Sequence, residues 1–168
     1  MFARLGPARP AQGAEAIARA VIVRAVGALA LAALAIIHVV DLPGTLGPTP
    51  LVGAGYLGII AAAVVTGGVM ITRSHWLAWA AAGGVAAAAM GGYVLTRAVP
   101  GGFLGDHADV GNWRCPLGIA ALSVEAILIL LVALAAWQAR GRARRVAPQH
   151  VPEPARPRTP EFSQGHTG

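Results

Sequence analysis

Glu125 is the residue whose position most demands a chemical explanation, because it interrupts the apolar sequence LSVEAILIL. A carboxylate that faces lipid near the middle of a bilayer costs at least about 2.5 kcal/mol. We therefore expect this side chain to face the interior of a helical bundle, where it either finds a polar partner or carries its proton. Any buried chemistry in this chain would centre on Glu125.

Three other polar side chains are expected near the depth of Glu125. Tyr93 and Arg97 are four residues apart, which places them on one face of a helix, and His38 lies near the end of a different apolar run. The predicted buried polar network consists of His38, Tyr93, Arg97 and Glu125. Such a network either fixes the packing of three helices or forms a proton-responsive or ligand-binding site.

Metal or haem binding is the other chemistry that histidine and aspartate side chains suggest. The chain has a single cysteine, Cys115, and lacks an HxxxH pair or a Cys-containing metal motif. Haem between helices would require two histidines at matching depth, whereas His38 and His75 are expected at opposite faces of the membrane. We predict no metal and no cofactor; the weak candidate ligands are His38, Asp41, Asp106, His107 and Asp109.

The sequence also lacks the short motifs of common enzyme classes. It contains no Walker motif, no GxSxG nucleophile elbow, no HExxH pair and no dinucleotide-binding fingerprint. We therefore predict no catalytic residues, and a non-enzymatic role is favoured over an enzymatic one.

The composition requires most of the chain to lie in lipid. Of the 168 residues, 56% are hydrophobic and only 12% are charged, and the mean hydropathy is +0.63. A soluble domain of this composition would aggregate, so a soluble enzyme is excluded. The net charge of +6 includes 13 basic residues, all of them arginine. We attribute this charge to membrane topology rather than to nucleic-acid binding.

Four apolar runs predict an all-α polytopic membrane protein, a bundle of four transmembrane helices with disordered tails. A helix needs roughly 20 residues to cross the hydrocarbon region. Asp41, Pro43 and Gly44 are expected to end the first helix, and Pro116 suits the start of the fourth. The transmembrane domain is predicted at 20–137, with spans at about 20–40, 51–72, 76–95 and 116–137. Residues 1–19 are a cytoplasmic segment, and the Arg- and Pro-rich residues 138–168 are a disordered tail.

A secretory signal peptide is the alternative interpretation of the first apolar run. The run is longer than the apolar core of a signal peptide, and no small-residue cleavage site precedes the polar turn at Asp41. We therefore favour a membrane anchor.

The distribution of arginine predicts that both termini lie in the cytoplasm. In this orientation only Arg97 and Arg114, of the 13 arginines, lie outside, as the positive-inside rule favours. We expect a multi-pass protein of a bacterial plasma membrane. Aromatic residues then fall near the inner interface (Trp76, Trp79, Trp137) and toward the outer one (Tyr56, Tyr93, Trp113).

Small residues recur at every fourth position of the second and third spans. In lipid, helices associate by close backbone approach over such residues. We expect the second and third spans to pack tightly as a hairpin through three rows: Ala54–Gly58–Ala62–Thr66, Gly83–Ala87–Gly91 and Gly84–Ala88–Gly92.

Four local motifs carry a resemblance to a protein family. They are IIHVV around His38, YVLTR at 93–97, NWRCPLG at 112–118 and SVE ending at Glu125. With these motifs the chain resembles the small four-span integral membrane proteins of actinobacteria, over about residues 20–138. The resemblance implies a membrane location and no particular reaction.

These observations lead to two functional hypotheses. The first is a structural or accessory subunit of a membrane assembly, with another membrane protein or a second copy as partner. The alternative is a small proton-coupled transporter or sensor that uses the network around Glu125. The lipid bilayer is a partner in both, and its anionic headgroups are expected to bind a basic cluster of Arg140, Arg142, Arg144 and Arg145.

Overall fold

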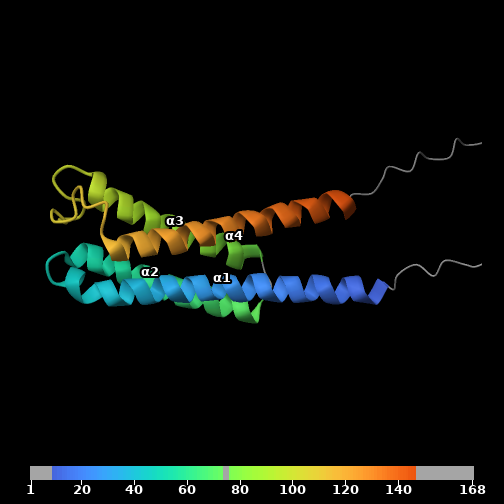
Figure 1. The fold of residues 1–168 in the computed structure, drawn as a ribbon. Coiled ribbons are helices and arrows are strands. Elements are labelled where there is room, and N and C mark those ends of the chain that lie inside the picture. Colours follow the sequence, from blue (N-terminus) through green and yellow to red (C-terminus); the bar gives the residue numbers. More distant parts are fainter. Residues whose placement is uncertain (1–8, 74–75, 147–168) are drawn as a thin grey trace, which may run out of the picture.

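The computed structural model describes residues 9–73 and 76–146. These residues contain four α-helices and no strands (Figure 1): α1 (Arg9–Leu46), α2 (Pro50–Thr72), α3 (Trp76–Ala98) and α4 (Pro116–Val146). Each helix includes a stretch that is long and apolar enough to cross a membrane: Gly13–Leu46, Pro50–Thr72, Trp76–Ala98 and Pro116–Gly141. The predicted fold class, an all-α membrane bundle of four helices, is confirmed.

The four helices form a ring in chain order. α1 packs on α2 and α4, and α3 packs on the same two helices, so α1 and α3 lie diagonally opposite. We call the end that carries the α1–α2 turn and the 99–115 loop the loop end, and the opposite end the tail end. Figure 1 shows α1 and α4 extending well beyond α2 and α3 at the tail end.

The first helix does not end at Asp41. It continues through Pro43 to Leu46, so the predicted end was wrong. Pro43 removes the backbone donor to the Val39 carbonyl, a loss that a transmembrane helix tolerates. Two residues further on, the Thr45 hydroxyl donates to the Asp41 carbonyl over 3.0 Å. Asp41 consequently lies inside the helix, on the turn that follows His38.

The expected disorder of the tails was also wrong for the segments next to the bundle. Residues 138–146 continue α4, and α1 is already helical at Arg9. Residues 138–146 consist mostly of Ala, Gln and Arg, which favour helices, and the first proline comes only at Pro148. The rest of the predicted tails, 1–8 and 147–168, lies outside the described residues.

The solid core of the bundle lies toward the tail end. Its large side chains are Leu31 and Leu34 from α1, Met70 from α2 and Leu128 from α4, all fully buried, and Ala82 and Ala86 fill the space beside them. The tightest glycine contact in this region is at Gly27, where a Cβ atom would lie 2.8 Å from the sulfur of Met70.

The small-residue rows do not join α2 to α3 as expected. α1 and α2 pack most extensively, and the α2–α3 contact is the smallest of the four. A Cβ atom on Gly58 or Gly84 would have nothing within 4 Å, whereas one on Gly83 would lie 3.3 Å from Val132 of α4. The rotation of each helix about its axis, which spacing alone cannot give, turns part of each row away from the neighbouring helix.

Candidate functional site

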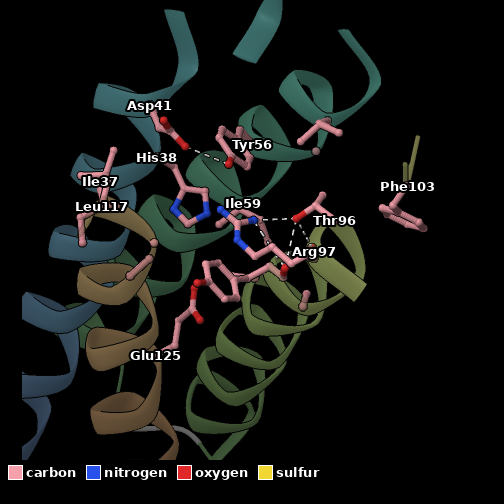
Figure 2. A pocket seen from close by; sticks show the side chains of 18 of the residues that line it. Ile37, His38, Asp41, Tyr56, Ile59, Thr96, Arg97, Phe103, Leu117 and Glu125 are labelled. Atoms are coloured by element: carbon pink, nitrogen blue, oxygen red, sulfur yellow. Dashed lines mark hydrogen bonds between the residues drawn. The ribbon is translucent and has the colours of Figure 1, made fainter. Parts of the chain in front are cut away.

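A cavity of about 210 Å³ lies in the loop-end half of the bundle and is bounded by all four helices and the 99–115 loop (Figure 2). Small residues leave this space open, and two of them, Ala88 and Gly92, belong to a row that was expected to pack helices together. The walls combine polar side chains with apolar ones, and Ile37, Ile59 and Leu117 are among the apolar ones. The cavity is closed toward the tail end by the solid core.

Glu125 lies at the deep end of this cavity. The side chain is 1% exposed, and Oε2 has no hydrogen-bond partner within the described part of the chain. Glu125 follows Ala121 by four residues and precedes Leu128 by three, so all three side chains lie on the buried face of α4. The structure thus places the carboxyl group in the bundle interior, as the cost of facing lipid predicts.

Arg97 is buried near the end of α3, and two of its partners come from the loop. Its Nη2 atom lies 3.2 Å from Oδ2 of Asp109, and Nε donates to the carbonyl of Asn112 over 3.1 Å. Nη1 donates to the Thr96 hydroxyl over 2.7 Å, and the guanidinium carbon lies 3.8 Å from the centre of the Tyr93 ring. Arg97 therefore fastens the 99–115 loop onto the bundle.

His38 and Tyr93 are each anchored by one hydrogen bond to a backbone carbonyl. Nδ1 of His38 lies 2.9 Å from the Leu34 carbonyl, which can only accept, so Nδ1 is the protonated donor. The Tyr93 hydroxyl donates to the Trp113 carbonyl over 3.0 Å. The Tyr93 ring packs so closely on α4 that a Cβ atom on Gly118 would collide with it.

The four residues of the predicted network thus line one cavity, but they are not joined in a single hydrogen-bonded network. Tyr93 and Arg97 touch directly. Arg97 is paired with the loop, and His38 is bonded to its own helix. Among the described residues no hydrogen bond joins Oε2 of Glu125 to any of them.

Asp41 and Tyr56 also line the cavity, although the predicted polar network included neither and Asp41 was expected only as a weak candidate metal ligand. The Tyr56 hydroxyl donates to Oδ2 of Asp41 over 2.9 Å, and the Tyr56 ring packs edge-on against the His38 ring with 4.8 Å between their centres. Asp41 follows His38 by three residues, which is a shared helix face. The expected helix end at Asp41 concealed this relationship.

A second hollow of about 410 Å³ lies at the loop end, and we call it the vestibule. Asp41 and Arg97 line both the vestibule and the inner cavity, so they lie between the two spaces. The remaining polar lining of the vestibule includes Thr45, Thr49, Asp106, His107, Asp109 and Cys115.

Four of the weak candidate metal ligands, Asp41, Asp106, His107 and Asp109, line the vestibule, and the side chains of Asp106 and Asp109 are hydrogen-bonded within the loop. Oδ1 of Asp106 accepts the backbone N–H of Asp109, and Oδ1 of Asp109 accepts from the Asn112 side chain. Gly102, at a φ of +83°, allows the backbone to pass close to Asp106 and His107. Across the described residues, no group of three or more His, Cys, Asp or Glu side chains could hold a metal ion.

The basic cluster lies on the part of α4 that projects at the tail end. Arg140 is exposed. Arg142, Arg144 and Arg145 continue the helix, but their side chains lie outside the described residues, as does His75.

No known protein family, curated protein or solved structure matches the chain. The fold and the cavity define its class: a polytopic four-helix membrane bundle that encloses an amphipathic cavity in one half and is solid in the other.

Proposed function

We propose that this protein is a membrane-embedded sensor that binds a small organic molecule in the cavity above Glu125. The observation that carries the proposal is the carboxyl oxygen Oε2 of Glu125, which has no hydrogen-bond partner among the described residues and is buried at the end of a cavity of about 210 Å³. A buried polar atom without a partner is costly, and native proteins keep very few of them. Cavities of about 150 Å³ already accept a benzene-sized molecule, so this one has room for a ligand that satisfies Glu125.

The closed end of the cavity favours sensing over transport. Leu31, Leu34 and Leu128 are fully buried just beyond Glu125. These side chains therefore separate the cavity from the tail end in the part of the chain that the structure describes, whereas a carrier would need an open route between them. Binding among four packed helices instead gives the ligand a means to change how those helices pack.

The distribution of arginine supports an orientation with the loop end outside the cell. Arg97 and Arg114 lie at the loop end, whereas Arg19, Arg24 and Arg140 lie toward the tail end. In this proposal the vestibule faces the extracytoplasmic side of a bacterial plasma membrane, and both termini are cytoplasmic. The basic cluster from Arg140 to Arg145 would then contact anionic headgroups of the inner leaflet.

Filling the cavity tests the proposal. Ala121 lines the cavity, while its neighbour Ala120 is exposed on the outer face of α4. Binding of 2-phenylethanol to purified protein in phosphatidylcholine nanodiscs should survive Ala120→Phe and weaken at least about tenfold in Ala121→Phe. Equal binding by the two variants, measured by saturation-transfer NMR, would show that the cavity is not the binding site.

A role as an accessory subunit is a second proposal, favoured by the open small-residue positions. Gly58 and Gly84 are exposed, and a Cβ atom on either would meet nothing within 4 Å. Such positions allow a helix of another membrane protein to approach closely. Gly84→Leu should remove a protein that co-purifies stoichiometrically from the native membrane, whereas Gly141→Leu, at an exposed glycine beyond the bundle, should retain it. Retention in both variants would contradict this role.

A further inference from the structure

The charges around the cavity do not balance. The charged side chains that line it are Asp41, Arg97 and Glu125. The positive charge of Arg97 is already compensated, because its guanidinium pairs with Asp109 of the loop. Neither Asp41 nor Glu125 forms an ion pair with any described residue. The cavity therefore has two carboxyl groups that have no cationic partner within residues 9–73 and 76–146.

The two carboxyl groups lie at different depths and on different helices. Asp41, on α1, lies where the vestibule meets the cavity, and one of its oxygens accepts the Tyr56 hydroxyl. Glu125, on α4, lies at the deep end, as Figure 2 shows. The walls that border the space between them include the apolar side chains of Ile37, Ile59 and Leu117. This arrangement complements a molecule with an apolar body and a cationic head.

We propose that the cavity ligand is an organic ammonium ion, a primary or secondary amine carried on a compact hydrocarbon or aromatic body. This inference rests on the proposed binding function and names the chemical class of its ligand. The ammonium group donates a hydrogen bond to Oε2 of Glu125, and the apolar body packs between α1 and α4. Asp41 attracts the cation from the vestibule.

The same contacts exclude other ligand classes. An anion is disfavoured, because the charge of Arg97 is already compensated by Asp109, and its Nε and Nη1 atoms donate to Asn112 and Thr96. An amino acid is disfavoured for the same reason, because its carboxylate would have to compete with Asp109 for Arg97. A bare metal ion would need several ligands at one place, and the described residues provide no such group.

A series of probes with one apolar body and different heads tests the ligand class. The probes are 2-phenylethylamine, 2-phenylethanol and 3-phenylpropanoate, titrated at pH 7 into protein in phosphatidylcholine nanodiscs. The amine should bind at least about tenfold more tightly than the alcohol, and the propanoate more weakly than both. Glu125→Gln should remove the preference for the amine while the alcohol still binds, and Ser123→Ala, at an exposed position of α4, should preserve it.

A fourth probe tests the hydrogen bond on the unaltered protein, so the inference does not depend on the folding of a variant. Phenylethyl-trimethylammonium keeps the charge but has no N–H group. It should bind at least about tenfold more weakly than 2-phenylethylamine. Equal binding of the two cations, or a preference for the propanoate, would overturn the proposal.

The outcomes separate this inference from the function on which it rests. If amine and alcohol bind equally and Ala121→Phe blocks both, the cavity is a binding site but its ligand is not an ammonium ion. If Ala121→Phe blocks neither, the cavity function itself fails. Nanodiscs that contain phosphatidylethanolamine identify the source of the ammonium group. Competition with the amine probe would show that the site takes a lipid headgroup and overturn a compact amine as ligand, while unchanged binding supports the free amine.

Discussion

The guanidinium of Arg97 lies 3.2 Å from the carboxylate of Asp109, and this contact decides the electrostatics of the whole site. It joins the last turn of α3 to the loop that covers the cavity. It also pairs the buried guanidinium of Arg97 with the loop, so this cation does not form an ion pair with Glu125. The sequence predicts one polar network that includes both Arg97 and Glu125. In the structure Arg97 instead anchors the loop, and Oε2 of Glu125 has no hydrogen-bond partner among the described residues.

Removing the side chain of Arg97, which anchors the 99–115 loop, should destabilise the protein. Arg97→Ala leaves Asp109 unpaired and frees the Asn112 carbonyl, and loss of one partner of a buried pair costs about 3–5 kcal/mol. Since Asp109 is 29% exposed, we expect a smaller loss, about 2 kcal/mol in the free energy of unfolding in detergent. Arg114→Ala, at an exposed loop position, should change it by less than about 0.5 kcal/mol. Similar unfolding curves for both variants would contradict the anchoring role.

We expect the close packing of the Tyr93 ring on α4 to require glycine at position 118. Gly118→Ala places a Cβ atom against that ring, and overpacking of this kind costs about 1–3 kcal/mol. Gly84→Ala is the matched control, because its Cβ atom would enter open space and alanine favours a helix by about 0.5–1 kcal/mol. Thermal denaturation followed by circular dichroism should therefore show opposite shifts. A gain of stability at both positions would disprove the close contact.

We expect Glu125 to lower the stability of the folded protein. Glu125→Leu replaces a buried polar group, which has no hydrogen-bond partner at Oε2 among the described residues, by an apolar one of similar size, and this removes a desolvation cost of about 1–3 kcal/mol. We expect a higher melting temperature in detergent together with loss of amine binding, the usual pattern for a residue retained for function. A lower melting temperature would instead assign Glu125 a purely structural role in helix packing.

Single cysteines should report the membrane orientation. In a Cys115→Ser background, a membrane-impermeant maleimide should label Arg114→Cys on intact cells. Arg140→Cys should react only after the membrane is opened, because these exposed positions lie at opposite ends of the bundle. The reverse pattern would place the loop end in the cytoplasm and the vestibule with it.

The sequence alone determined the class of fold and the burial of Glu125. Backbone polar groups in lipid must be satisfied within each segment, so four apolar runs of sufficient length become four helices. A carboxyl group within such a run must turn inward, since lipid does not solvate it. These conclusions need only residue type, run length and the properties of the bilayer.

Only the tertiary structure decided which groups meet. The pairs Arg97–Asp109 and Asp41–Tyr56 join different elements, so they depend on how each helix is rotated and on the path of the loop. The same rotation turned Ala88 and Gly92 toward a cavity instead of a tight helix contact. Residue spacing specifies neighbours within one helix, whereas the partner across the bundle is set by the packing of all four helices together.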